Sequence, residues 1–375
     1  MRLLHVHSGN MFGGVERMLE AMSPAWAGLE PVASRFALCF EGSVKDRLEA
    51  AGATVDVLGP VQVRRPDRLL SARHRLRSLV ARGNFDAAVV HSAWGHALFG
   101  RTVLDAGLPL IRWIHAPGPG PSWLERWSRR IRPNLLICNS HYTRSAVHLP
   151  WSDVAIEVHY PPARPSAADA MARAELRRAL ETSPDTRVIA MASRLEGWKG
   201  HRLLIDALAR VAATGWVAWI VGGAQHPSEV PYFDELVGRV AGLGLSDRVR
   251  FLGQRSDVDR ILAAADLYCQ PNQGPEPFGL SIVEALSAGL PVVATRLGAF
   301  PEIVTDACGV LVDPESVQGL AAALDDLLRD PTRRLAMAEA ARRRALVFCD
   351  LPESLRRLAR TLAGAGVVAP AFSVS

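Results

Sequence analysis

Two glutamates eight residues apart, Glu276 and Glu284, stand in the segment PNQGPEPFGLSIVEALSAGLPVVAT, residues 271–295. Its glycines and prolines predict a loop after the apolar run LYCQ, and residues 280–287 then predict a short helix. Carboxylates accept hydrogen bonds from vicinal hydroxyl groups. Glu276 in the loop and Glu284 on the helix could therefore bind the same ligand from two positions. The alternative is structural, with Glu284 favoured by the helix dipole and Glu276 solvated in its loop.

The start of this helix also suits an anion. Backbone N–H groups near Phe278, Gly279 and Leu280 precede the first helical hydrogen bonds and lie at the positive end of the helix dipole. Backbone amides that can bind a phosphate therefore lie beside carboxylates that can bind sugar hydroxyl groups. This combination fits a nucleotide sugar better than a dinucleotide or a phosphorylated metabolite.

Two cations occupy the segment ASRLEGWKGHRLLIDAL, residues 192–208. An apolar run ends at its start, and Gly197 and Gly200 let the chain turn into a helix. Arg194 and Lys199 therefore flank a loop at a strand end, where two positive charges suit a diphosphate. For this loop taken alone, ordinary surface charge is the alternative.

A glycine-rich turn follows the first apolar run, in HSGNMFGGVERM, residues 7–18. A strand, a glycine turn and a helix start suit a phosphate. Laid on Gly9, however, the dinucleotide fingerprint G-x-G-x-x-G requires a glycine where the chain has Met11, and finds one only at Gly14. A tight turn that needs positive φ is the alternative for this segment.

Short β-type runs alternate with helix-length amphipathic segments along the whole chain. This alternation predicts parallel sheets with crossover helices. It stops at YPPARPSAADA, residues 160–170, whose prolines continue neither strand nor helix, and then begins again. We therefore expect two Rossmann-like α/β domains, residues 1–165 and 166–348. Ligands of such sheets bind at the carboxyl ends of the strands, so the expected site is a cleft between the domains.

Composition narrows the possible classes of protein but does not select a function. The 375 residues, 49% of them hydrophobic, exceed what one core usually supports. The N-terminal apolar run is too short for a signal peptide and no stretch approaches the roughly 20 apolar residues of a membrane span, so we expect a cytoplasmic protein. The five cysteines form no C-x-x-C pair, which indicates neither zinc nor disulfides. A net charge of +5 permits acidic ligands but does not indicate nucleic-acid binding.

Several segments together resemble one family. EPFGLSIVE, followed by ALSAGLPVVAT and GAFPEIV, resembles the Glu-x7-Glu signature of glycosyltransferase family 4, the retaining nucleotide-sugar transferases of GT-B fold. SRLEGWKG resembles its arginine-lysine diphosphate loop, GNMFGGVERM its N-terminal glycine loop and VHYPPA its hinge strand. The resemblance spans nearly the whole chain. It implies that the last helix, residues 349–365, crosses back onto the first, acceptor-binding domain, and that the second domain binds the donor.

The resemblance implies a role for each donor-side residue. The first glutamate of the signature lies by the donor sugar and the second binds the ribose hydroxyls, which corresponds to Glu276 and Glu284. The arginine and the lysine hold the diphosphate, which corresponds to Arg194 and Lys199. The nucleotide diphosphate sugar is a co-substrate, and we expect no cofactor.

Four first-domain residues receive roles in the same way. Gly13 and Gly14 would close over the donor diphosphate. A histidine that ends a first-domain strand often lies near the transferred sugar, and His115 in RWIHAPG matches that position. His91, at the end of the apolar run in VVHS, is a second candidate. A strand-end histidine with a local hydrogen bond is the alternative for both.

Three further features are interpreted as structural. Asp257 and Asp259 spell D-x-D, the metal motif of the other large glycosyltransferase fold, but they open a helix, where Asp is an ordinary cap. We therefore expect no metal. The family's usual Gly-Gly before E-I-V is Gly298-Ala299 here, a mild change that bears on the backbone contacts of this element. Glu302 in the same element is taken as structural.

Two basic segments, RLLSARHRLRSLVARG and SWLERWSRRIR, could lie on an anionic membrane and bring a lipid-linked acceptor to the site. Trp123 and Trp127, four residues apart, belong to the second segment. A solvated basic face with the aromatic rings packed on the sheet is the favoured alternative.

The predicted activity is transfer of a sugar, with retention, from a nucleotide diphosphate to a glycan, lipid-linked or small-molecule acceptor, without metal. No first-domain loop carboxylate has a strong claim to be the general base of an inverting reaction. A catalytically silent nucleotide-sugar-binding protein of this fold is one alternative. A Rossmann oxidoreductase, with Glu41 holding a ribose, is another, but Met11 and the lack of a hydride-transfer constellation oppose it.

Overall fold

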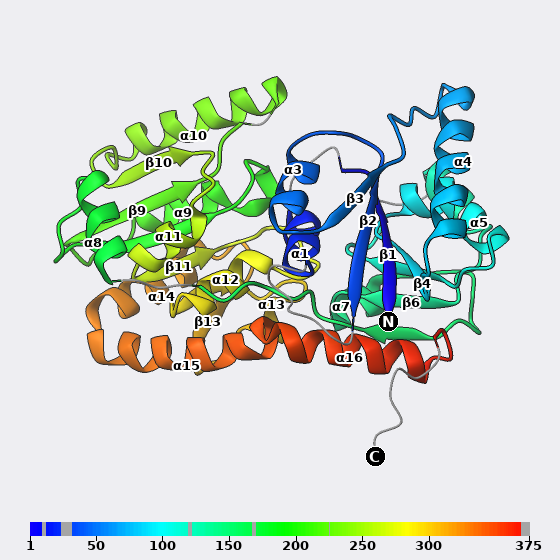
Figure 1. Cartoon of the computed structure of the whole chain (residues 1–375). Coiled ribbons are helices and arrows are strands. Elements are labelled where there is room, and N and C mark those ends of the chain that lie inside the picture. Colours follow the sequence, from blue (N-terminus) through cyan, green and yellow to red (C-terminus); the bar gives the residue numbers. More distant parts are fainter. Residues whose placement is uncertain (10–12, 24–31, 119–121, 167–169, 225, 369–375) are drawn as a thin grey trace, which may run out of the picture. The chain divides into compact units, whose positions relative to one another are not determined.

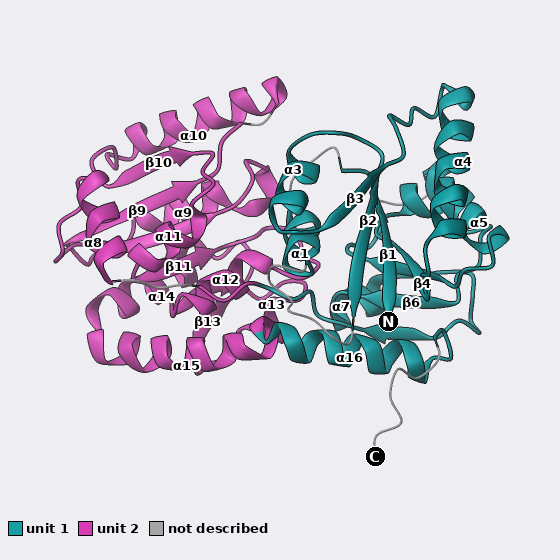
Figure 2. Ribbon diagram, viewed as in Figure 1, with its two compact units in different colours: residues 1–163, 350–375 teal, residues 164–349 magenta. Residues whose placement is uncertain are grey.

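The computed structural model describes residues 1–9, 13–23, 32–118, 122–166, 170–224 and 226–368. The chain forms two compact units (Figures 1 and 2). Unit 1 comprises Met1–Ala163 with Asp350–Ser375, and unit 2 comprises Arg164–Cys349. Each unit is a parallel sheet with helices on both faces, the architecture that alternating strands and helices predict.

Among its described residues, unit 1 has a seven-stranded sheet of order β3-β2-β1-β4-β5-β6-β7. Strands β4, β5 and β6 are buried along their whole length, as expected for apolar runs covered on both faces. The strands are β1 (Arg2–His7), β2 (Ala33–Leu38), β3 (Thr54–Val57), β4 (Ala87–Val90), β5 (Leu110–Ile114), β6 (Leu135–Cys138) and β7 (Ile156–Val158). The helices are α1 (Gly14–Ala21), α3 (Ser43–Ala50), α4 (Pro66–Arg82), α5 (Ala93–Asp105), α6 (Trp123–Ser128), α7 (His141–Ala146) and α16 (Leu351–Gly364).

Successive strand residues of unit 1 enter different cores, because their side chains alternate between the faces of the sheet. Leu3 packs with helices α1, α3 and α16, whereas Leu4 packs with α4 and α5. Helix α16 contributes a leucine stripe at Leu351, Leu355 and Leu358, the spacing of one helix face. The C-terminal helix is therefore part of the unit 1 core.

Unit 2 has a six-stranded sheet of order β10-β9-β8-β11-β12-β13 among its described residues. Its strands are β8 (Arg187–Ala192), β9 (Trp216–Val221), β10 (Val249–Gly253), β11 (Leu267–Gln270), β12 (Val292–Thr295) and β13 (Gly309–Val312). Its helices are α8 (Ala170–Ala179), η1 (Gly197–Lys199), α9 (His201–Leu208), η2 (Pro227–Glu229), α10 (Val230–Gly242), α11 (Val258–Ala264), α12 (Leu280–Ser287), α13 (Phe300–Ile303), α14 (Val317–Arg329) and α15 (Pro331–Cys349).

Each sheet has one place where the strand order reverses direction. In unit 1 it lies between β1 and β4, and in unit 2 between β8 and β11. Loops that leave the carboxyl ends of such neighbouring strands diverge to opposite faces and leave room for a ligand. The loops that follow these four strands are therefore the first places to look for a site.

Within the described ranges, none of the helices is both long enough and apolar enough to cross a membrane. The same part of the chain contains no group of three or more His, Cys, Asp or Glu side chains arranged to hold a metal ion.

Candidate functional site

Unit 2 joins two loops at the reversal of its strand order. Residues 193–200 follow β8 and residues 271–279 follow β11. The Trp198 carbonyl oxygen accepts hydrogen bonds from the backbone N–H of Gln273 at 2.7 Å and of Gly274 at 3.3 Å. The segment that carries the predicted cations and the segment that carries the predicted carboxylates thus form one local structure.

Two glycines allow the close approach of these loops. Gly200 has φ +82°, and a Cβ there would lie 1.8 Å from the Pro271 carbonyl oxygen. Gly298 has φ +58°, and a Cβ there would lie 2.2 Å from the Glu276 carbonyl oxygen. Ala299 has φ −85° and donates its N–H to that oxygen at 2.9 Å. The departure from Gly-Gly therefore falls where alanine fits, and the glycine that the backbone requires is present.

Lys199 and Glu276 form the centre of this local structure. Lys199 Nζ donates to Glu276 Oε2 at 2.6 Å, and the two side chains are only 13% and 16% exposed. Asn272 Nδ2 donates to the same oxygen at 2.7 Å. Lys199 Nζ also lies 4.0 Å from the centroid of the Trp198 ring. The carboxylate and the ammonium group are thus held in place before any ligand arrives.

A buried polar chain supports Asn272 from behind. Asn272 Oδ1 accepts from Gln270 Nε2 at 2.6 Å, and Gln270 Oε1 accepts from the Tyr268 hydroxyl at 2.9 Å. Burial raises the pKa of Tyr268, so its phenol keeps the proton that it donates. The sequence analysis missed these residues. Their signal is the alternation along LYCQPN, which places positions 268, 270 and 272 on one face.

Helix α12 begins next to this centre. Gly279, at its N-cap, has φ +107°, and a Cβ there would lie 2.8 Å from a ring atom of Phe300. Phe278 is buried, with its ring centroid 5.8 Å from that of Phe348. Its side chain therefore fixes the loop to the core, and a contribution to ligand binding must come from its backbone. Leu280 and Glu284 are half-buried on the outward face of α12, one turn apart.

Arg194 is not joined to this centre. Its guanidinium group donates to Glu196 Oε1 at 2.9 Å, and its side chain is 46% exposed. Exposed ion pairs typically contribute about 0–1 kcal/mol, so a phosphate could displace Glu196 from Arg194 at little cost. The structure thus brings Lys199 and Glu276 together and pairs Arg194 elsewhere.

A chain of histidines crosses the carboxyl ends of the central unit 1 strands. His5 Nδ1 lies 2.9 Å from His91 Nε2, and His91 Nδ1 lies 3.0 Å from His115 Nε2. His5 Nε2 lies 3.2 Å from the Ser34 hydroxyl oxygen. Adjacent rings stack with centroids 5.2 Å apart. Because His91 is buried inside the chain while His115 is half-buried at its end, His115 is the member that a ligand can reach.

These histidines are neutral near neutral pH. Burial lowers the pKa of His5 and of His115 to about 3, and it lowers the pKa of His91 well below its usual value. A neutral imidazole has one donor and one acceptor nitrogen, so all the hydrogen bonds along the chain must run in one direction. The tautomer of His115 is therefore tied to that of His91 and His5.

The first glycine turn is described only in part, since Met11 lies outside the described residues. Gly13 is the N-cap of α1 with an extended backbone, and a Cβ on Gly14 would meet no atom of the other described residues within 4 Å, apart from its chain neighbours and the backbone of its own helix. Glu16, one turn into α1, lies with Oε1 2.6 Å from His7 Nε2. The backbone conformation at position 14 does not require glycine. Among the described residues, the missing side chain leaves open space at the start of this helix.

Two family models match consecutive parts of the chain. The model described as Glycosyltransferase Family 4 matches residues 12–167, and the model described as Glycosyl transferases group 1 matches residues 172–344. The chain belongs to glycosyltransferase family 4. The predicted family and the predicted fold class, two Rossmann-like domains of GT-B type, are both confirmed.

Relatives of this family 4 chain include two mannosyltransferases. The lipopolysaccharide core biosynthesis mannosyltransferase LpsB of Rhizobium meliloti is 32% identical over 45% of this chain and 48% of the relative. A GDP-mannose-dependent monoacylated alpha-(1-6)-phosphatidylinositol monomannoside mannosyltransferase of Corynebacterium glutamicum is 37% identical over 68% of this chain and 64% of the relative. The chain thus matches about half to two thirds of the length of these relatives.

A solved structure covers more of the chain. HepE of Anabaena in complex with UDP-glucose superposes with a TM-score of 0.83 at 26% identity, over 97% of this chain and all of the other. The similarity therefore extends over both units of this family 4 member.

The D-x-D of this family 4 chain has a different local role from the one predicted. Asp257 is the N-cap residue of α11, but its side chain makes no cap hydrogen bond. Its two oxygens instead accept from Arg255 at 2.8 and 2.7 Å. That guanidinium group lowers the pKa of Asp257. The expectation of an ordinary side-chain cap was wrong, because a neighbouring arginine offers a stronger bidentate partner.

Proposed function

We propose that this chain is a retaining glycosyltransferase that moves a sugar from a nucleotide diphosphate sugar to an acceptor hydroxyl group. The observation that carries the proposal is the meeting of Lys199, Glu276 and the start of α12 at the strand-order reversal of unit 2. A positive charge, a carboxylate and helix N–H groups within one local structure match a diphosphate attached to a sugar. The similarity to HepE, whose structure contains UDP-glucose, supports this reading.

Donor binding would rearrange the charges of unit 2. The diphosphate takes Lys199 from Glu276 and Arg194 from Glu196, and it accepts from the amides of Phe278, Gly279 and Leu280. Glu276, still held by Asn272, is then available to the sugar hydroxyls. Glu284, on the outward face of α12, accepts from the ribose hydroxyls.

The transfer step breaks the bond from the anomeric carbon to the diphosphate oxygen and forms a bond from that carbon to the acceptor oxygen. The acceptor proton moves to the departing diphosphate on the same face, which gives retention. Lys199 and the α12 amides stabilise the negative charge that develops on the leaving group. Neutral His115 orients or polarises the sugar, and Gly13 and Gly14 leave space for the diphosphate beside α1.

We further propose that the reaction needs no divalent metal and no cofactor. The charge of the leaving diphosphate is met by two cations and a helix N-terminus, which is the work that a metal would otherwise do. Activity in excess EDTA should equal activity in magnesium. Loss of activity in EDTA, restored by magnesium or manganese, would contradict this.

The acceptor is proposed to be a glycan, a lipid-linked sugar or a small molecule, and not a nucleic acid. The names of the relatives above indicate that they act on lipopolysaccharide core and on an acylated phosphatidylinositol mannoside.

We place the enzyme in the cytoplasm. Trp127 packs against the unit 1 core and Trp123 stacks on it at 6.0 Å while remaining 49% exposed, so Trp123 is the residue for a peripheral contact with an anionic membrane.

Titration calorimetry with UDP, GDP and ADP tests donor binding, and proton NMR of the fresh product tests retention. We expect saturable binding of one of these nucleotides and, with its sugar donor, slow hydrolysis even without acceptor. Binding of none would remove the donor assignment. An inverted anomeric linkage would leave the binding site intact but overturn the retaining mechanism.

A further inference from the structure

A cavity of about 430 Å³ lies at the amino end of the unit 2 sheet, away from the loops described above. Its lining includes Arg187 at the start of β8, Asp266 just before β11 and Pro291 just before β12. The proposed donor loops leave the opposite, carboxyl ends of these strands. The cavity is therefore a separate place in the fold, and its interpretation does not rest on the proposed function.

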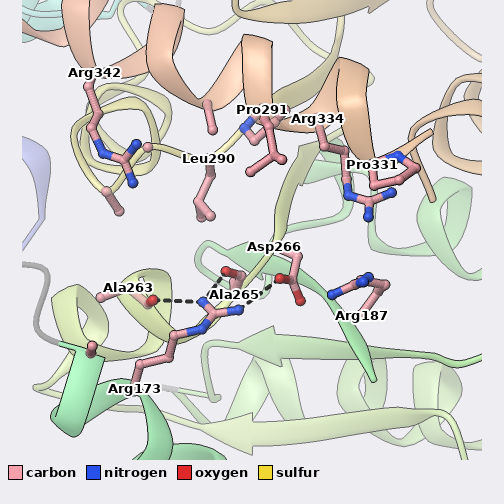
Figure 3. Close-up of a pocket in the computed structure, with 15 residues that line it drawn as sticks. Arg173, Arg187, Ala263, Ala265, Asp266, Leu290, Pro291, Pro331, Arg334 and Arg342 are labelled. Atoms are coloured by element: carbon pink, nitrogen blue, oxygen red, sulfur yellow. Dashed lines mark hydrogen bonds and ion pairs between the residues drawn. The ribbon is translucent and has the colours of Figure 1, made fainter. Parts of the chain in front are cut away.

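The cavity is lined by four arginines and one carboxylate. Figure 3 shows Arg334 and Arg342 extending from α15 on one side and Arg173 with Asp266 on the other, with Arg187 beside Asp266. Four guanidinium groups against one carboxylate leave an excess of positive charge around the space.

Among the described residues, the carboxylate already accepts three hydrogen bonds, none of them from Arg187, Arg334 or Arg342. Asp266 Oδ1 accepts from Arg173 Nη2 at 2.7 Å. Its Oδ2 accepts from Arg177 Nη2 at 2.6 Å and from the Val188 backbone N–H at 2.7 Å. Arg173 also donates to the Ala265 carbonyl oxygen at 2.6 Å. Arg173 is therefore accounted for by the local structure.

The other three arginines are only partly accounted for. Arg334, which is 8% exposed, donates to the Leu328 carbonyl oxygen at 2.7 Å at the end of α14. The guanidinium group of Arg342 lies against Gly289, just beyond the end of α12, where the helix dipole favours a cation. Helix capping thus explains part of the cluster.

Helix capping does not explain Arg187, which begins a strand. Within the part of the chain that the structure describes, the side chains of Arg187 and Arg342 make no hydrogen bond or ion pair. Burial lowers the pKa of Arg334, and the positive charge of Arg187 lowers it further, although Asp266 and Asp330 act against this. Arg187 and Arg334 thus repel each other across the cavity, and an anion between them would relieve that repulsion.

We propose that this cavity binds a small phosphorylated anion, with a phosphate group between Arg187 and Arg334 and the rest of the molecule extending toward Arg342. The planar fork of a guanidinium group matches phosphate oxygens, and the volume is in the range of small-ligand sites. A free phosphorylated metabolite and a phospholipid headgroup share this chemistry. Since Arg342 lies against the end of α12, which also carries Glu284, the anion would stabilise the element that the donor site uses.

Titration calorimetry with inorganic pyrophosphate tests the site, in a protein whose Arg194 and Lys199 are both changed to alanine so that the donor loops do not compete. We expect saturable binding, weakened about tenfold or more by Arg187→Gln and less by Arg342→Gln. Arg343→Gln is the matched control, because Arg343 is the next residue on α15, is exposed and pairs with Glu339. We expect it to bind like its parent.

Circular dichroism and thermal unfolding should show that Arg187→Gln folds like its parent, since the Arg187 side chain has no hydrogen-bond or ion-pair partner among the described residues. Arg187→Lys should recover part of the affinity. Equal pyrophosphate affinity in all the variants, or no saturable binding in the parent, would overturn the proposal.

Vesicles distinguish the two sources of phosphate. We expect vesicles of phosphatidylcholine with one fifth phosphatidic acid not to compete with pyrophosphate, because the space lies at the strand ends of a folded unit and suits a free metabolite. Competition by these vesicles that Arg187→Gln abolishes would overturn the free-metabolite assignment and identify a lipid headgroup.

Discussion

The carboxyl ends of the two sheets occupy equivalent positions in their units but carry opposite chemistry. In unit 2 the residues there form ion pairs, between Lys199 and Glu276 and between Arg194 and Glu196. In unit 1 they are neutral imidazoles, joined from His5 through His91 to His115. The unit 2 residues follow β8 and β11, which border the reversal of strand order, whereas in unit 1 His5 lies in β1, His91 follows β4 and His115 follows β5.

The difference follows from what surrounds each set. The histidines are stacked on one another, with His5 and His91 buried and His115 half-buried, which removes much of the hydration that a cation needs. The unit 2 charges lie on half-buried or exposed loops and have opposite charges beside them. Under the proposed function, one edge would exchange ionic partners with a diphosphate, and the other would present a neutral donor or acceptor to an uncharged sugar.

Lys199→Ala is expected to have the largest effect on donor binding. It removes the charge-assisted contact to the diphosphate, so affinity for the nucleoside diphosphate should fall about tenfold to a hundredfold, and turnover should fall with it. Arg194→Ala should act in the same direction. Calorimetry measures the affinity, and Lys45→Ala, which breaks exposed ion pairs to Glu41 and Glu49, is the matched control.

The two glutamates should separate binding from transfer. Glu284→Ala should weaken nucleoside diphosphate binding, because its proposed partner is the ribose. Glu276→Ala should chiefly slow transfer, because its proposed partner is the sugar. The reverse pattern would mean that the two roles are exchanged, while unchanged affinity in Lys199→Ala and Arg194→Ala would remove the diphosphate site from these loops.

His115→Ala is expected to slow transfer more than it weakens donor binding, since the proposed partner of the histidine is the sugar and not the diphosphate. His91→Phe should have a smaller effect in the same direction, because it keeps a ring in the stack but removes the partner that fixes the tautomer of His115. His148→Ala, at an exposed position of unit 1, is the control. Equal loss of donor affinity and rate in His115→Ala would instead make it a donor-binding residue.

Acid should destabilise unit 1 before unit 2. Burial lowers the pKa of four unit 1 histidines, His5, His96, His115 and His159, to about 3, but of only one unit 2 histidine, His201, to about 4. Their usual value is 6.5, so the unfolded chain binds more protons below that pH. The stability they contribute is complete above pH 6.5 and is lost as pH falls toward 3.

Hydrogen exchange at about pH 7.5 and 5.5, with exposure times scaled for the intrinsic exchange rate, checks this. Peptides from β1, β4 and β5 should lose protection before peptides from β8 and β9. Carboxylates interfere little in this window, because their usual pKa values lie near 4. Earlier loss in unit 2 would mean that the buried histidines are not neutral in the folded protein.

Sequence patterns predicted the alternating fold, because fully buried strands such as AAVV and LLIC leave a direct trace in hydrophobicity. They also indicated Lys199, Glu276 and Glu284, because charged residues next to glycine turns at strand ends are unusual enough to notice. These assignments as site residues remain predictions. The two family models that match the chain test only the family to which the chain belongs.

Interactions between distant segments were not predictable. Nothing in the sequence pairs Lys199 with Glu276, because that pairing depends on how two loops meet. The chain from Tyr268 through Gln270 was missed because polar residues in a strand read as exposed. Asp257 does open α11, but the side-chain cap expected there is absent because Arg255, two residues away, binds the carboxylate.

Glycines at the two edges also differ, and this yields the smallest expected effect. Gly298→Ala would push a Cβ into the Glu276 backbone, so it should cost much stability. Among the described residues, Gly14→Ala meets no atom within 4 Å outside its own helix and chain neighbours, and it lies at the start of α1, where alanine is a better helix former by roughly 0.5–1 kcal/mol. Its thermal midpoint should therefore stay the same or rise. If Gly14 keeps space for the donor diphosphate, the added methyl group should still weaken nucleoside diphosphate binding, by about a few-fold. Gly238→Ala in α10, also with open space, is the matched control and should change stability alone. Equal donor affinity in Gly14→Ala and Gly238→Ala would mean that the unit 1 glycine turn does not approach the diphosphate, and that donor binding belongs to the charged edge of unit 2.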